Sequence, residues 1–232
     1  MTDTKLFLQH ELMLLAIADR EGTFSHGMFL CSIAGAMVSE LLLRERIVAK
    51  DDKMETVAVI DESPTGDVIL DKLLQQIVES KKHHGLRHWV TKAAALPNLK
   101  HRIAHQLCNI GALKHDEKKV LWVFTQNVYP EIDGSWEDAV RNRMAKTMFD
   151  DGVTPDSETA ILIALAKHSN LLSANFSKDK LRQHKTRIND LANGDLLASG
   201  ATKATIQAVQ TAAMVAVTVS YTHLTLPTIL LV

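Results

Sequence analysis

The stretch from Gly27 to Ile47, GMFLCSIAGAMVSELLLRERI, decides the fold of this chain. Written as a helix it is apolar nearly all the way round, and such a helix has to be surrounded by other protein. We therefore expect a central helix whose neighbours pack closely against a waist of small side chains: Ser32, Ala34, Gly35 and Ala36. A membrane span is the alternative, but the apolar run is short for a bilayer and Glu40 would be costly in hydrocarbon.

Composition limits the class of protein. The chain has 232 residues, of which 46% are hydrophobic, and this is enough for a sizeable core. We expect one domain over residues 1–219. The 26 basic and 27 acidic residues give a formal net charge of -1, so no global field draws the protein to nucleic acid or membranes. An anionic partner therefore has to bind at a local patch.

The two ends and the cysteines indicate where the chain works. Cys31 and Cys108 fall in apolar helical patterns, which is typical of reduced cysteines that pack inside a cytosolic protein. The opening MTDTKLFLQHE lacks the basic start and apolar run of a signal peptide, so we expect a cytoplasmic protein. Residues 220–232 carry no Lys, Arg, Asp or Glu and break off from the preceding pattern, and we expect a non-native or disordered tail there.

Hydrophobic spacing predicts a mainly α fold, with amphipathic helices around the central one. Asp67 is expected in the first turn of its helix, with Asp67 and Asp71 facing solvent. The helices are expected over 8–17 with Thr4 as N-cap, 68–80, 98–110 with Asn98 as N-cap, 136–149, 160–172 after Thr154 as N-cap, 178–192 and 202–219.

Two segments are β-prone. Glu55 to Ile60 reads as a short strand. Ala112 to Tyr129 predicts a protruding hairpin, with the apolar run Val120–Phe124 at its centre and a turn that includes His115–Lys118. Within it, Trp122 and Phe124 are candidates for contact with a membrane interface or with a second subunit.

Positive side chains gather where the helix over 98–110 begins. Lys100, His101 and Arg102 occupy its first turn, where the helix dipole disfavours cations. A bound anion would make the cations favourable there, because a phosphate group is held by free backbone N–H groups together with charged donors. The alternative is an ordinary basic face exposed to solvent.

Nothing in the chain predicts an enzyme or a cofactor. The sequence contains no glycine-rich phosphate loop, nucleophile elbow or paired acidic motif. His84 and His88, like His101 and His105, have the four-residue spacing of metal ligands, but no third ligand is evident and we interpret them as surface histidines.

Several stretches occur in a familiar order: LFLQHELMLLAIADREGTF, GAMVSELLLRERI, PTGDVILDKLLQQI, HWV and RIAHQLCNIGAL, followed by the hairpin that ends near Tyr129-Pro130. The most specific is Pro64-Thr65-Gly66-Asp67 with Leu70-Asp71. From about Leu6 to its last expected helix the chain resembles the Golgi phosphoprotein family, whose eukaryotic members are phosphatidylinositol 4-phosphate effectors. The resemblance implies a helical bundle with a hairpin used in membrane contact and self-association. It also implies a non-enzymatic role, reading a lipid headgroup and, in eukaryotes, retaining Golgi glycosyltransferases.

The headgroup pocket of that family is retained in part. The loop before the central helix, Thr23–Gly27, has no tryptophan, and the family's central-helix arginine position falls on Ala34. Two later basic positions fall on Pro97 and Lys100, and Arg102 matches a further basic residue. This pattern resembles the prokaryotic members more than the Golgi ones.

We therefore expect a peripheral membrane adaptor that binds a phosphatidylinositol 4-phosphate-like headgroup, on Golgi membranes if the source is eukaryotic. The expected headgroup residues are Lys100, His101, Arg102 and His26. Two alternatives stay open. A helix followed by a hairpin also suggests a winged-helix-like nucleic-acid module, although the helix lacks a continuous basic surface and nucleic acid is not the expected partner. The other alternative is a protein-interaction scaffold with no lipid ligand.

Overall fold

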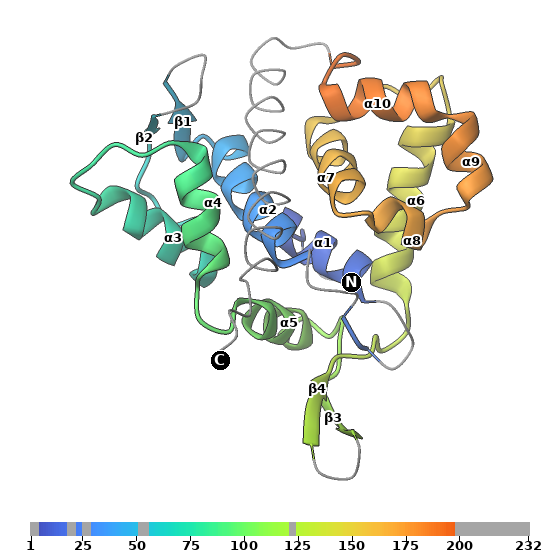
Figure 1. Cartoon of the computed structure of the whole chain (residues 1–232), viewed down its shortest axis with the longest axis horizontal. Helices are drawn as coiled ribbons and strands as arrows, with labels where there is room; N and C mark the ends of the chain where they lie inside the picture. The colour runs from blue at the N-terminus through green and yellow to red at the C-terminus, as the bar shows by residue number, and fades with distance from the viewer. Residues whose placement is uncertain (1–4, 18–21, 25–28, 51–55, 121–123, 198–232) are drawn as a thin grey trace, which may run out of the picture.

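The structure is a computed structural model that describes residues 5–17, 22–24, 29–50, 56–120 and 124–197. It is mainly helical, as the sequence predicts, with two small antiparallel sheets (Figure 1). The elements in chain order are α1 (Leu8–Ala16), α2 (Phe29–Leu43), β1 (Ile47–Ala49), β2 (Val57–Val59), α3 (Val68–Val78), α4 (Leu86–Ala94), α5 (Leu99–Asn109), β3 (Asp116–Val120), β4 (Phe124–Val128), α6 (Ser135–Phe149), α7 (Ser157–His168), α8 (Leu171–Asn175), α9 (Lys178–Gln183) and α10 (Lys185–Asn193).

Helix α2 is the central helix, and it packs against α1, α4 and α7. The small waist lies where expected: a Cβ added at Gly35 would come within 3.3 Å of Leu165 Cδ2 on α7. The buried Glu40 carboxyl accepts hydrogen bonds from the Leu8 N–H at 2.8 Å and from Arg44 Nε at 2.7 Å. The central helix therefore carries a buried acidic group that its neighbours pair.

The end of α2 differs from the prediction. The helix stops at Leu43 and not at Ile47, because Glu45 takes a left-handed conformation with φ of 52°. Ile47 then starts β1, which pairs antiparallel with β2, so that Ile47 lies opposite Val59. The β-prone run before Ile60 was predicted correctly, but its partner strand was not predicted, and Ile47, the first residue of that strand, was assigned to the helix.

Helix α1 is not amphipathic, contrary to the prediction, because all nine of its residues are buried. Its polar residues find partners far along the chain. Gln9 Nε2 lies 3.4 Å from Asp67 Oδ2, and His10 Nε2 lies 3.0 Å from Gln106 Oε1. Arg143 Nη2 donates to Glu11 Oε2 at 2.6 Å. Phe7 occupies the N-cap position, and Thr4, the predicted cap, lies outside the described residues.

Asp67 caps α3, but it does not face solvent. Its Oδ1 accepts the N–H groups of Ile69 and Leu70 at 2.8 and 2.9 Å, and the residue is only 3% exposed. Its other oxygen, Oδ2, accepts from Gln106 Nε2 at 3.0 Å. Asp71 is half-buried, and its Oδ1 accepts from the Thr65 hydroxyl at 2.7 Å. The solvent-facing interpretation was wrong for Asp67.

The second half of the chain packs α6, α7, α8 and α10 together beside α1 (Figure 1). The N-cap of α7 is Asp156 and not Thr154, since the Asp156 side chain accepts the Thr159 N–H. The predicted helix over 160–172 breaks at Asn170, which has a φ of 61°, and the one over 178–192 breaks at His184 into α9 and α10. The expected helix over 202–219 and the tail lie outside the described residues.

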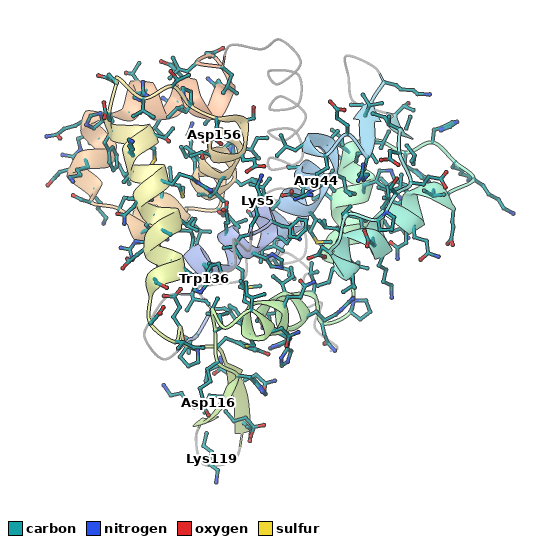
Figure 2. The ribbon with its side chains drawn as sticks, turned by 180° about the vertical axis from the view of Figure 1, so that it is seen from behind. Lys5, Arg44, Asp116, Lys119, Trp136 and Asp156 are labelled. Carbon is teal, nitrogen blue, oxygen red and sulfur yellow. The ribbon has the colours of Figure 1, made fainter. Side chains whose placement is uncertain are left out.

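The β3–β4 hairpin projects from the helical body, and Figure 2 shows Asp116 and Lys119 on it, away from the helices. Its turn was predicted in the wrong place. Asp116–Lys118 belong to β3 and pair with residues 126–128, and the ladder continues to the pair of Val120 with Phe124. The error arose because the strands are polar and exposed on both faces, which imitates a turn in the sequence.

Candidate functional site

Helix α5 begins with unpaired backbone donors. Asn98 precedes it in a left-handed conformation, with φ of 53°, and its side chain makes no capping hydrogen bond. Within the described residues, the N–H groups of Lys100 and His101 have no hydrogen-bond partner. A helix start with free amides is suited to hold an anion.

The Lys100 side chain lies beside an aromatic ring from the loop before α2. Its Nζ is 5.5 Å from the centroid of Phe24, within the range of a cation–π contact. No carboxylate of the described residues forms an ion pair with Lys100. No described carboxylate therefore neutralises its positive charge.

His101 is held against the base of the hairpin. Its Nδ1 shares a hydrogen bond of 2.9 Å with the hydroxyl of Tyr129, a residue that is fully buried. The Tyr129 ring is also packed by His105 and His115, at centroid distances of 5.5 and 5.4 Å. Burial lowers the pKa of His101, and the nearby Lys100, His105 and His115 lower it further. Three imidazoles thus surround one tyrosine where the hairpin joins α5.

Arg102 leaves the helix on a different side. It is two residues beyond Lys100, which is about 200° around an α-helix. Its half-buried side chain makes no hydrogen bond or ion pair with the part of the chain that the structure describes. The structure thus brings Lys100 and His101 to one place, with Arg102 in the same turn but on another face.

The other predicted contact residues are placed only in part. Phe124 is the first residue of β4, at the far end of the hairpin. His26 and Trp122 lie outside the described residues.

The sequence profile of the family described as Golgi phosphoprotein 3 (GPP34) matches residues 8–209, most of the chain. The chain belongs to the Golgi phosphoprotein 3 family. It is also 24% identical, over 164 residues, to vacuolar protein sorting-associated protein 74 of Eremothecium gossypii. That match covers 62% of this chain and 49% of the relative, so the chain spans about half the length of this curated protein. The resemblance seen in the sequence is confirmed.

Two aromatic residues of the site in this Golgi phosphoprotein 3 family member were missed from sequence. The loop before α2 has no tryptophan, yet it supplies Phe24, whose ring is 5.5 Å from that of Tyr129. The two are brought together by Gly22, whose carbonyl accepts the Tyr129 N–H at 2.9 Å. No local pattern in the sequence predicts this contact, because the two residues are far apart along the chain.

The described residues of this family member form neither a membrane-spanning helix nor a metal cluster. Of its described helices, none is long and apolar enough to cross a membrane. Among the residues that the structure places, no group of three or more His, Cys, Asp or Glu side chains is arranged to hold a metal ion.

Proposed function

We propose that this chain is a peripheral membrane adaptor that binds phosphoinositide headgroups of the phosphatidylinositol 4-phosphate kind at the start of α5. In a eukaryotic cell the membrane is that of the Golgi. Membership of the Golgi phosphoprotein 3 family supports the role. The cationic start of α5 supports the location of the headgroup.

One observation carries the proposal. Two backbone N–H groups without acceptors lie in the same helical turn as the Lys100 ammonium, which has no acidic partner among the described residues. A phosphate monoester accepts several charge-assisted hydrogen bonds at once and complements the positive end of the helix. The Phe24 ring limits water on one side of the ammonium, which strengthens its attraction to an anion.

The remaining predicted residues fit this proposal in supporting roles. Arg102 contacts the headgroup or a neighbouring anionic lipid from the next face of α5, and His101 lines the site. His26 contributes from the loop before α2. Trp122 and Phe124 insert at the membrane interface or contact a second copy of the chain, and Phe124 begins β4.

Vesicle flotation tests the proposal. Neutral phosphatidylcholine vesicles are compared with the same vesicles containing phosphatidylinositol 4-phosphate, using the parent chain and the double variant Lys100→Glu with Arg102→Glu. Removing two charge-assisted contacts, each of about 1.5–3 kcal/mol, is expected to weaken binding at least tenfold.

A matched control carries the same charge change elsewhere. Lys178 and Lys185 are exposed first residues of α9 and α10, far from the hairpin, where glutamate suits the helix dipole (Figure 1). Lys178→Glu with Lys185→Glu should float like the parent. Equal recovery with and without phosphoinositide, or equal losses in both double variants, would remove the proposal.

A further inference from the structure

An open groove of about 660 Å³ lies between α3 and α4, which stand beside each other in Figure 1. This volume is in the range of small-molecule sites. Helix α3 contributes Lys72, Gln76 and Glu79, which share one face because they are spaced by four and three residues. Helix α4 contributes His88 and Lys92 in the same way. Two helix faces are thus turned toward one space.

The groove has an excess of positive groups. Lys72 and Lys92 line it, and neither forms an ion pair with any described residue. Its one acidic lining residue, Glu79, accepts a hydrogen bond from Gln75 Nε2 at 2.8 Å. The other titratable lining groups are His84 and His88.

The two histidines are stacked face to face. The ring centroids of His84 and His88 are 3.7 Å apart, with an angle of 10° between the planes. Two imidazoles this close cannot both become charged without a counter-ion, because like charges disfavour each other. Burial lowers the pKa of His88, and His84 and Lys92 lower it further. An anion in the groove would relieve this repulsion.

The groove also has an apolar side. Trp89 is 3% exposed and stands edge-on to His88, at a centroid distance of 5.1 Å. Leu96 and Pro97 continue this surface toward α5. The Trp89 Nε1 is buried and has no hydrogen-bond partner in the part of the chain that the structure describes. The lining of the groove therefore combines cations with aromatic and aliphatic residues.

We propose that the groove between α3 and α4 binds a phosphate monoester, with the phosphate between Lys72, Lys92 and the stacked pair of His84 and His88. The organic part of the ligand lies on Ala95 and Pro97, the exposed apolar residues of the groove. Binding is coupled to proton uptake, since the dianion lets the imidazoles become charged. This site uses neither Lys100 nor Arg102, so the inference does not rest on the proposed function.

The experiment follows the C–H resonances of His84 and His88 by NMR while the pH is varied. The probes are glycerol 3-phosphate, sodium sulfate, and vesicles of phosphatidylcholine with or without phosphatidic acid. Glycerol 3-phosphate at millimolar concentration is expected to raise the pKa of His88 by about half a unit or more. In Lys72→Gln with Lys92→Gln, two changes at exposed positions, the shift is expected to disappear.

The different probes distinguish a free phosphate ester from a lipid headgroup, and the variants distinguish this groove from the start of α5. A shift with the soluble ester supports a free metabolite, and a shift only with phosphatidic acid vesicles supports a lipid headgroup. Lys100→Glu with Arg102→Glu should leave the response to the soluble ester unchanged, whatever it does to flotation. No shift with either monoester, an equal shift with sulfate, or a shift that survives in Lys72→Gln with Lys92→Gln overturns the inference.

Discussion

Replacing Gly22 with alanine tests how the hairpin is fastened to the helical body. Gly22 has φ of +76°, and its carbonyl accepts the Tyr129 N–H at 2.9 Å. An added Cβ would lie 2.1 Å from the backbone nitrogen of Pro130, whereas real Cβ contacts under 3.0 Å are essentially never seen. The Gly22→Ala variant therefore has to separate two backbones, and no rotation of a side chain can relieve the overlap.

The magnitude follows from a matched pair of glycines. Gly111 has nearly the same φ, +78°, but a Cβ there would meet nothing within 4 Å. Gly111→Ala should cost about 1–2 kcal/mol, the penalty of a left-handed alanine. Gly22→Ala carries the same penalty plus about 1–3 kcal/mol for overpacking against a backbone. We expect the free energy of unfolding to fall about 2 kcal/mol further in Gly22→Ala than in Gly111→Ala.

Thermal and urea unfolding of the parent and both variants measures the difference. For a chain of this size, about 2–4 °C of Tm corresponds to 1 kcal/mol. Gly22→Ala should therefore melt at least about 4 °C below Gly111→Ala. Equal melting temperatures for the two variants would refute the close approach of the loop before α2 to the end of the hairpin.

Three further changes test single interactions. Asp156→Ala removes the N-cap of α7, which accepts the Thr159 N–H at 2.8 Å, and should cost about 1 kcal/mol in urea unfolding, whereas Asp156→Ser should recover most of it. Burial, together with nearby acidic groups, raises the pKa of Glu131 to about 7. Between about pH 4.5 and pH 7 the folded state therefore binds a proton that the unfolded state has lost, and this proton binding stabilises the fold. The stabilisation is lost as the pH rises through 7. Glu131→Gln should accordingly raise the Tm more at pH 8 than at pH 5, and an equal change at both would contradict the burial of this carboxyl. Arg143→Leu leaves the buried Glu11 carboxyl without its partner and should lower the free energy of unfolding by about 2 kcal/mol. The expected loss is smaller than for a fully buried pair because Arg143 is partly exposed. Adding Glu11→Gln should return part of that loss, and a double variant no more stable than Arg143→Leu would show that the pair does not interact.

Most helices were predictable because they depend on local patterns, whereas α4 and β1 were not predicted. A mostly apolar run such as Ile33–Leu43 is expected to be buried wherever it lies, and Asp67 before an apolar periodic run is expected to cap a helix. The polar residues of α1 were misjudged for a different reason. Gln9, His10 and Glu11 are buried by partners 58, 96 and 132 residues away, and no local spacing reveals such pairings.

The candidate site was predictable only along α5. Lys100, His101 and Arg102 are adjacent in the sequence, so their gathering in one helical turn could be foreseen. The contact between Phe24 and Tyr129 could not be foreseen, because the segment from α2 to β4 separates them along the chain. The helical angle between Lys100 and Arg102 was available from the numbering alone, and it argues that they contact different atoms of any ligand.

Asp67 makes the assembly of the fold cooperative. One of its oxygens binds the first turn of α3, while the other faces amide groups from α1 and α5. If any of these three helices detached, a buried polar group would lose its partner at a cost of about 1–3 kcal/mol. The three should therefore open and close as a single unit, and their slowest amide protons should exchange with solvent at a common rate.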